Sequence, residues 1–532
     1  MAAFHLTGRP CNLVQTDATA RVLFGHQRRA GLLKQATMLS TTTFHCKLGS
    51  RPAPLRHPWR HCVGSGHATL ALRADWQQQL ATAHKELGFR HVRFHGLLDD
   101  DMGTLIRQDA QFVFSFHNID RIFDFLLSIG MKPIVELGFM PSTLASGSDT
   151  VFHYRGNVTP PKNPSDWALL VTQLAEHWVE RYGIKEVSQW PIEVWNEPNL
   201  SMFWKGDQAA YLALYEATWQ ALKAVSPRFH VGGPATAQNA WLPEFDAFCR
   251  AHHCAPDFLS THYYPTDAFG EIGADTATQL QHAPPGVMRK RAAEARKIAG
   301  DRPQYYTEWN ITSSPRDALH DGAFCAALAV KLTMSVDDLV DAWSWWVFSD
   351  IFEEDGMPSQ PFHGGFGLMN LHGVPKPVFR GFELLQRLGT GRWQVEGSHD
   401  TVTCWAGDGD WQGKGRDGSA ASPMPSAILW VNVAMPHHAI ASESVRLSIP
   451  HQGDHRVKAA HATRIDETHA NPRAAWQALG SPVCLSPAGV ERLQVASQLV
   501  DEVHSVVADD AQTWVELVLP PQSLALVRLE WS

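Results

Sequence analysis

Several features that mark specialised protein classes are absent from this sequence. Its eight cysteines are scattered over 532 residues, with no Cys-x-x-Cys pair and no Cys/His spacing typical of zinc sites. A disulfide framework is therefore not expected, and neither is a metal centre. No apolar run approaches the roughly 18 residues that a membrane-spanning helix needs. We therefore predict a chain with reduced thiols, no metal and no membrane as a partner.

The sequence also lacks an excess of positive charge. Its 45 Lys and Arg residues stand against 54 Asp and Glu, a net charge of −9, which argues against nucleic acid as a partner. No G-x-G-x-x-G turn follows an early strand, so a doubly wound nucleotide-binding sheet is the less favoured architecture and no cofactor is expected. Trp and His are plentiful instead, with 20 and 28 residues. Sugar-binding clefts use both, although large cores also hold Trp.

The first 45 residues are basic and nearly free of acid, and they contain no apolar secretory core. Their composition leaves two interpretations open. Residues 1–45 are either a poorly ordered, transit-like extension or the product of a mis-assigned start, with Met38 as the true initiator. The missing signal peptide favours the cytoplasm over the periplasm as the compartment.

Between about residues 58 and 380 the chain alternates short β-rich runs with helical patterns, which is typical of βα units. The expected strands are His61–Gly64, His91–His95, Pro133–Leu137, Ile192–Asn196, His230–Gly233, Phe258–Tyr264, Gln304–Trp309 and Ala342–Phe348. The expected helices are Asp75–Leu87, Asn118–Ile129, Pro164–Tyr182, Gln208–Val225, Trp241–His252, Val287–Ala299 and Asp317–Val336. Eight strands and seven helices predict an α/β fold, a (β/α)8 TIM barrel over residues 46–380.

After residue 380 the pattern changes to short alternating runs separated by turns rich in Gly, Pro and Asp. These runs include Ala427–Val433, Ser444–Ile449, Thr513–Leu519 and Leu524–Leu529. Alternation of this kind predicts antiparallel strands. Residues 381–532 are therefore expected to form a smaller C-terminal β-sandwich domain.

Two glutamates follow or end buried strands of the predicted barrel. Glu197 comes after the apolar run that begins at Pro191, and Pro198 forces a turn directly after it. Glu308 lies in the seventh strand. In a closed barrel the carboxyl ends of the fourth and seventh strands face one another across the mouth. Two carboxylates placed in this way are what the hydrolysis of a glycosidic bond needs.

Several motifs, in order, resemble those of glycoside hydrolase family 39, the β-xylosidase and α-L-iduronidase family. They are Gly64-Ser65-Gly66-His67-Ala68, Arg93-Phe94-His95-Gly96, Glu197-Pro198-Asn199-Leu200, His262-Tyr263-Tyr264-Pro265, Thr307-Glu308-Trp309 and Ser349-Asp350-Ile351-Phe352-Glu353-Glu354. The resemblance implies a retaining mechanism, with Glu197 as general acid/base and Glu308 as an ionised nucleophile. It also implies that Asn196 contacts the 2-OH of the sugar, although a turn cap would explain the same residue.

The resemblance implies further substrate contacts, each with a structural alternative. His95 and His262 are placed to hold sugar hydroxyls, and Tyr264 to donate to Glu308 and keep the pKa of that carboxyl low. Phe203 and Trp346 are expected to wall the sugar site. Glu353 is expected to accept from a hydroxyl, or else to belong to a solvated acidic run with Glu354.

That acidic run bears on the choice of sugar. An enzyme for iduronic acid needs a cation near the sugar carboxylate, whereas here no Lys or Arg follows the eighth strand before Lys376. We therefore expect an exo-acting β-xylosidase that releases xylose from the ends of xylo-oligosaccharides. An α-L-iduronidase or another pyranosidase of the same clan is the first alternative, and a non-catalytic sugar-binding barrel is the second. The oligomeric state stays open.

Overall fold

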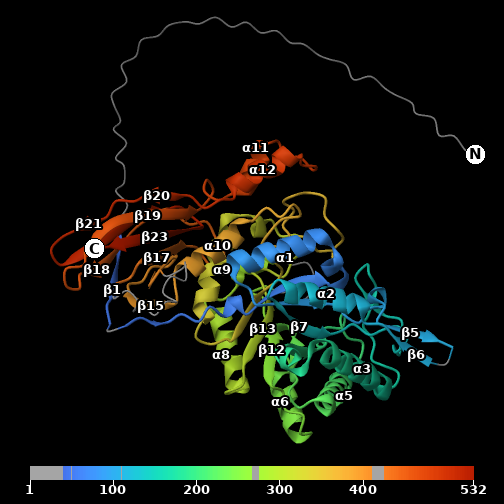
Figure 1. Cartoon of the computed structure of the whole chain (residues 1–532). Coiled ribbons are helices and arrows are strands. Elements are labelled where there is room, and N and C mark those ends of the chain that lie inside the picture. The colour runs from blue at the N-terminus through green and yellow to red at the C-terminus, as the bar shows by residue number, and fades with distance from the viewer. Residues whose placement is uncertain (1–39, 50, 110, 267–274, 410–423) are drawn as a thin grey trace, which may run out of the picture. The chain divides into compact units, whose positions relative to one another are not determined.

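A closed barrel of eight parallel strands forms the centre of the computed structural model, which describes residues 40–49, 51–109, 111–266, 275–409 and 424–532 (Figure 1). Around the barrel the strands are β10 (Pro191–Val194), β11 (His230–Thr236), β12 (Phe258–His262), β13 (Gln304–Trp309), β14 (Ala342–Trp345), β3 (Cys62–His67), β4 (His91–His95) and β7 (Lys132–Leu137). The predicted barrel is confirmed. Buried, mostly apolar strands produce it, because a parallel sheet is covered by helices outside and packed inside.

Each of the seven predicted helices is present, six of them within one residue of their expected bounds, whereas α9 begins six residues later than expected, after the short 3-10 helix Ala318–Asp321. They are α1 (Ala74–Leu87), α2 (His117–Ser128), α3 (Pro164–Tyr182), α5 (Gln208–Val225), α6 (Leu242–Ala251), α8 (Val287–Ala299) and α9 (Ala323–Val336). Helix α10 (Pro377–Arg387) was not predicted, and neither were the short helices α4 (Ile184–Val187) and α7 (Thr276–His282). Helix α10 begins at Pro377, as helices often do, and buries Phe379, Phe382 and Leu385. The expected domain boundary at residue 380 therefore falls inside the last helix of the barrel.

The C-terminal residues form a second, largely antiparallel sheet with its own core. Its strands run in the order β20, β19, β23, β17, β16, β15, β1, β18, β22 and β21, with β2 beside β15. Their bounds are β1 (Thr42–Lys47), β2 (Ala53–Pro54), β15 (Gly391–Glu396), β16 (Val402–Gly407), β17 (Ala427–Asn432), β18 (Glu443–Pro450), β19 (Val457–Ile465), β20 (Asp501–Val503), β21 (Val507–Ala508), β22 (Gln512–Leu519) and β23 (Ser523–Trp531). Two helices not predicted from the sequence, α11 (Pro472–Ala478) and α12 (Pro487–Ala496), follow β19.

Strand β1 changes the expected N-terminal boundary. It pairs antiparallel with β15 and parallel with β18, and the Phe44 ring lies 5.4 Å from that of Trp430 in the core of the second sheet. A boundary between residues 45 and 46 therefore divides a strand of this sheet. The rest of the expected extension, residues 1–39, lies outside the described residues.

Most of the tryptophans are packing residues. Eleven of the largest fully buried side chains among the described residues are Trp, including Trp76, Trp167 and Trp343. The abundance of Trp in the sequence therefore reflects the core more than a sugar cleft.

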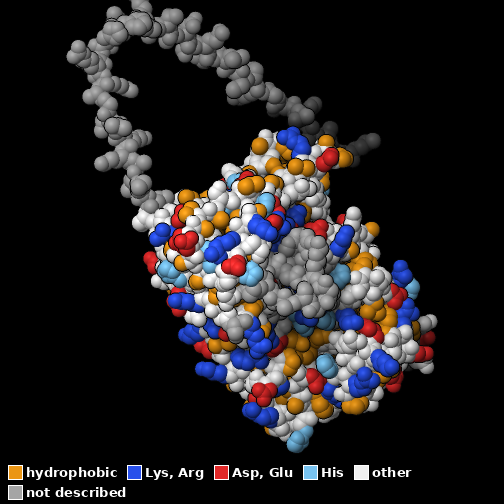
Figure 2. All heavy atoms as spheres, turned by 60° about the vertical axis from the view of Figure 1, so that its left-hand side comes forward, with side chains coloured by type: hydrophobic (Ala, Val, Ile, Leu, Met, Phe, Trp, Pro, Cys, Tyr) orange, Lys and Arg blue, Asp and Glu red, His pale blue; other side chains and the backbone are white. Residues whose placement is uncertain are grey.

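Among the described helices, none combines the length and apolar character needed to cross a bilayer. On the face drawn in Figure 2, Lys and Arg side chains lie among Asp and Glu.

Candidate active site

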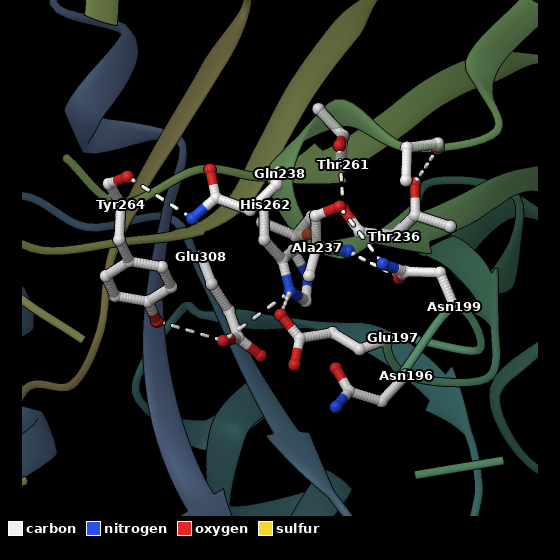
Figure 3. A network of polar contacts seen from close by, with 12 residues as sticks. Asn196, Glu197, Asn199, Thr236, Ala237, Gln238, Thr261, His262, Tyr264 and Glu308 are labelled. Atoms are coloured by element: carbon white, nitrogen blue, oxygen red, sulfur yellow. Dashed lines mark hydrogen bonds and ion pairs between the residues drawn. The ribbon is translucent and has the colours of Figure 1, made fainter. Parts of the chain in front are cut away.

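Two buried carboxylates meet at the mouth of the barrel. Glu197 follows β10 and Glu308 lies in β13, three strands further around the barrel, and their residues are only 6% and 5% exposed. One carboxylate oxygen of each and one nitrogen of His262 lie within 4.8 Å of one another (Figure 3). Carboxyl groups about 5–5.5 Å apart suit a retaining glycosidase, whereas inverting enzymes need about 6.5–9.5 Å. The spacing here therefore suits double displacement.

The backbone turns sharply where it presents Glu197. Strand β10 ends two residues before its expected end, and Trp195 and Glu197 then adopt positive φ angles of 70° and 43°. Such angles cost a non-glycine residue roughly 1–3 kcal/mol and persist only where the surroundings hold them. Backbone bonds do so here, because Glu197 N–H donates to Ala235 at 2.9 Å and Leu200 N–H donates to the Glu197 carbonyl at 2.9 Å. The carboxylate is thereby carried on a fixed turn.

A buried guanidinium connects the two sides of the site. Arg93 of β4 is fully buried and donates to Glu308 at 2.7 Å and to the Asn196 side-chain oxygen at 2.9 Å. It also pairs with Glu193 at 2.5 Å and Glu136 at 2.8 Å. The sequence analysis quoted Arg93 in a motif but gave it no role. The sequence does indicate a role for Arg93, since a charged residue between Val92 and Phe94 in a buried strand needs a partner inside the barrel.

The Arg93 network is expected to be essential for stability. We predict that Arg93→Met lowers the free energy of unfolding by about 3–5 kcal/mol, because it leaves buried carboxylates without their cation. Arg93→Lys keeps the charge but loses the fork of donors, and we expect a smaller loss. Midpoints of urea unfolding compare the two variants with the wild type. Equal midpoints for all three proteins would contradict the prediction.

Glu308 experiences opposing electrostatic influences. Burial raises the pKa of its carboxyl above the ordinary value, while the positive charges of Arg93 and His95 act in the opposite direction. The Tyr264 hydroxyl donates to Glu308 at 3.0 Å, as the sequence analysis anticipated (Figure 3). Because burial outweighs these contacts, the expectation of a lowered pKa is corrected. Arg93 and Tyr264 hold the ionised carboxylate in place rather than making it a strong acid.

Hydrogen bonds connect His262 to Glu197 rather than to the cavity. Burial, followed by the charges of Arg93 and His95, holds the pKa of His262 well below its ordinary value, so the ring is neutral. Thr307 donates its only hydroxyl hydrogen to Glu193 at 2.8 Å. Since His262 Nε2 lies 3.2 Å from that hydroxyl, the network assigns the ring proton to Nε2. Nδ1, 2.9 Å from Glu197 Oε1, is then an acceptor, which suits a protonated carboxyl.

A cavity of about 250 Å³ opens over these groups. Five of the residues predicted as substrate contacts line it, namely His95, Asn196, Phe203, Tyr264 and Trp346. Trp346 packs over Gly64, where a Cβ atom would collide with its ring, which explains the small residue in the Gly-Ser-Gly motif. The remaining two, His262 and Glu353, do not line the cavity.

Glu354, and not its neighbour Glu353, faces the cavity. The carboxylate of Glu353 lies 3.2 Å from His67 and 3.4 Å from His153. Glu354 lines the cavity, and its Oε1 is buried, 3.6 Å from His95 and without a hydrogen-bond partner among the described residues. Glu354 therefore lines the cavity, whereas Glu353, which was expected to contact the sugar, does not. Consecutive side chains point in different directions, so only one of the pair can turn to the substrate.

Carboxylates surround His67 beside the cavity. It lies 3.2 Å from Asp99 and Glu353 and 3.4 Å from Asp101. Burial opposes a charge on this ring, but hydrogen bonds with Asp101, Asp99 and Glu353 outweigh it and raise the pKa of His67 to about 11. The resulting imidazolium neutralises the carboxylates. Although the cluster has the spacing of a metal site, a cation is already present in the form of His67, which also ties the Glu353 segment to the barrel.

The two neighbouring glutamates are expected to affect stability in opposite ways. Burial raises the pKa of Glu354 to about 8 from the ordinary 4.5, so the folded protein is penalised increasingly as the pH rises through this interval. We predict that the melting temperature of Glu354→Gln, minus that of the wild type, increases between pH about 5 and about 8.5. Differential scanning fluorimetry across this range measures the difference. A constant difference would contradict the prediction.

Glu353→Gln is the matched control for this measurement. The hydrogen bond from His67 lowers the pKa of Glu353. The ionised carboxylate therefore stabilises the fold above its ordinary pKa, and this contribution is lost as the pH falls through the lowered value. We expect Glu353→Gln to melt below the wild type at neutral pH and to approach it in acid.

Comparisons with known proteins agree with this geometry. The family model described as Glycosyl hydrolases family 39 matches residues 46–513. A β-xylosidase of Caldicellulosiruptor saccharolyticus is 41% identical over 488 residues, which cover 91% of this chain and 97% of that protein. A crystal structure of a monomeric β-xylosidase from Caulobacter crescentus CB15 has a TM-score of 0.76 and 32% identity, with 92% of this chain and 99% of that one covered. The human α-L-iduronidase is 32% identical over 199 residues, only 34% of this chain and 28% of that protein.

Proposed function

The chain belongs to glycosyl hydrolases family 39, and from this premise we propose that it is a retaining β-xylosidase. The observation that carries the proposal is the pair of buried carboxylates, Glu197 and Glu308, whose oxygens lie within 4.8 Å at the barrel mouth. The arrangement suits a nucleophile on one side of a sugar ring and a proton donor on the other.

The reaction proceeds in two displacements. Glu308 attacks the anomeric carbon while Glu197 gives its proton to the glycosidic oxygen, so that the alcohol leaves and a xylosyl ester forms on Glu308. Glu197, now ionised, takes a proton from water, and the oxygen of that water attacks the anomeric carbon and releases Glu308. Both steps invert the anomeric centre, so the product keeps the β configuration.

Three further residues support the reacting pair. Arg93 binds both Glu308 and Asn196, and because the side-chain oxygen of Asn196 accepts from Arg93 at 2.9 Å, its amide nitrogen is the group available to a sugar hydroxyl. This contact strengthens as charge develops in the transition state. Glu354, with its unpartnered buried oxygen, is the second candidate for a hydroxyl contact. Burial raises its pKa to about 8, so its protonated form can donate a hydrogen bond to a hydroxyl of the sugar.

The charge of the cavity favours a neutral sugar. The described lining residues include four acidic side chains, Glu197, Glu308, Glu354 and Asp355, but no Lys or Arg. Lys376 is fully buried between Asp321 and Asp350, at 2.8 and 2.7 Å, and therefore cannot reach a substrate. A uronic acid would bring its carboxylate to these acidic groups, and the basic side chain among the described lining residues, His95, already pairs with Glu136 at 2.7 Å. Xylose carries no C6 group and avoids the repulsion.

A panel of aryl glycosides tests the proposal. We expect the highest kcat/KM for a 4-nitrophenyl β-D-xyloside, with lower values for the α-L-arabinoside and β-D-glucoside and no turnover of an α-L-iduronide. Proton NMR during the first minutes should show β-xylose before mutarotation. Preference for the iduronide, or α-xylose as the first product, would overturn the assignment.

A further inference from the structure

The mouth of the cavity carries apolar side chains beside its polar ones. Four of its half-buried lining residues are apolar, namely Phe152, Leu200, Met202 and Pro315. The buried lining residues at the floor include the polar groups that suit a sugar ring, such as Asn196. A second sugar at the mouth would need hydrogen-bond partners there as well, since unpaired hydroxyls lose their contacts with water.

Three of the polar side chains at the mouth, Gln238, Ser313 and Asp355, have partners within the protein. The Gln238 amide donates to the carbonyl oxygen of Tyr264 (Figure 3) and to that of Thr266, at 3.4 Å each. The Ser313 hydroxyl donates to the Thr266 carbonyl at 3.2 Å. Asp355 pairs with Arg316 at 2.9 Å. What the described mouth offers to a ligand is therefore mainly apolar surface.

This apolar surface lies on the leaving-group side. The general acid gives its proton to the leaving oxygen, so the chain segment next to Glu197 faces the departing group. Leu200 and Met202 lie on that segment, and Leu200 N–H is bonded to the Glu197 carbonyl at 2.9 Å. Phe203 follows, with its ring 5.7 Å from that of Phe152 in an edge-to-face contact.

Phe152 is held over the mouth by its own backbone. Its φ angle of 58° is unfavourable for an aromatic residue. It lies between the short paired strands β8 (Thr150–Val151) and β9 (Gly156–Asn157), which constrain it. A strained conformation that is retained at a site mouth points to a functional contact.

We propose that the leaving-group site takes an apolar or aromatic alcohol in preference to a second sugar. The preferred substrates are then alkyl or aryl β-xylosides rather than xylo-oligosaccharides. The inference rests on the proposed function and specifies the class of its aglycone. The bonds made and broken are those of the two displacements above, with the apolar alcohol leaving as its neutral form after it receives the Glu197 proton.

The comparison of methyl and hexyl β-D-xylopyranoside with the full chain tests this inference. The two leaving alcohols have similar acidity, so the ratio of their kcat/KM values reports contact with the mouth alone. Each buried CH2 contributes roughly fourfold, and we expect hexyl to exceed methyl by about tenfold or more. A ratio near one, with both xylosides hydrolysed, would overturn the inference and leave the β-xylosidase assignment intact. Failure to hydrolyse any β-xyloside would instead refute the proposed function.

Variants assign the preference to this surface. Met202→Gln keeps the length of the side chain but makes it polar, and we expect it to lower the hexyl-to-methyl ratio about threefold or more. Met202→Leu should keep the ratio. Leu169→Gln, on α3 and 42% exposed, is the control for an apolar residue outside the site. A Met202→Gln ratio equal to that of the wild type would contradict the assignment of this surface.

Competition between two acceptors directly tests whether the leaving-group site prefers an apolar alcohol to a sugar. The xylosyl-enzyme formed from a 4-nitrophenyl β-xyloside is offered benzyl alcohol and methyl α-D-xyloside at equal concentration. The acceptor occupies the place of the leaving group, so we expect more benzyl xyloside than disaccharide. An excess of disaccharide would overturn the inference.

Discussion

Glu308→Ala should hydrolyse a 4-nitrophenyl β-xyloside roughly 10⁴-fold or more slowly than the wild type, because no group remains to form the covalent intermediate. Added azide should restore turnover. Removal of the carboxylate leaves a space where Glu308 contacted Arg93 at 2.7 Å and Tyr264 at 3.0 Å, and this pair of donors favours a small anion. Azide attacks the anomeric carbon once, and the expected product is therefore α-xylosyl azide.

Glu308→Gln is the matched control for this rescue. It also lacks a nucleophile, but its amide fills the space that azide needs, so we expect inactivity with or without azide. Melting temperatures close to that of the wild type would show that both variants fold. Full activity of Glu308→Ala, or a β-xylosyl azide product, would refute the nucleophile assignment.

The meeting of Glu197 and Glu308 at the barrel mouth could be predicted because it depends on strand order. The sequence analysis placed the glutamates at the fourth and seventh strands, and β10 and β13 occupy those positions in the closed barrel. Short continuous apolar runs are typical of parallel strands, since such strands are buried on both faces. What strand counting leaves open is the separation of the oxygens, which depends on the backbone turn at Trp195 and Glu197.

The charged residues that surround Glu197 and Glu308 were harder to predict from the sequence. Arg93, Glu136 and Glu193 are far apart in the chain, and only the barrel brings them to 2.5–2.8 Å. Which of Glu353 and Glu354 lines the cavity could not be predicted from the sequence, for a different reason. Both follow β14 in a segment without regular secondary structure, where no periodicity indicates which side chain turns inward.

The domain boundaries show the limit of local patterns. The change to alternating runs near residue 380 was visible in the sequence, but α10 extends to Arg387 and still belongs to the barrel. In the same way, Thr42–Lys47 joins the second sheet through pairing with β15 and β18. The packing of α10 on the barrel and the pairing of β1 with β15 and β18 involve residues far apart in the sequence. Local composition carries little information about such contacts.

Replacement of Glu197 by Ala should separate substrates by their leaving groups. A 2,4-dinitrophenolate departs without protonation, so kcat/KM for its β-xyloside is expected to fall less than about tenfold. A methyl xyloside requires the proton, and its kcat/KM should fall about 10²–10⁴-fold. A uniform loss across these substrates would contradict the acid role.

The second displacement gives an independent test of the same residue. Without Glu197 no base activates water, so the xylosyl-enzyme should accumulate with the dinitrophenyl substrate, as a burst followed by slow turnover. Azide needs no base and should accelerate the release. Because azide now replaces water on the covalent intermediate, two inversions occur and the product is β-xylosyl azide. The Glu197→Ala and Glu308→Ala variants are thus expected to give opposite anomers, an outcome that requires the acid/base and nucleophile roles to lie on opposite faces of the sugar.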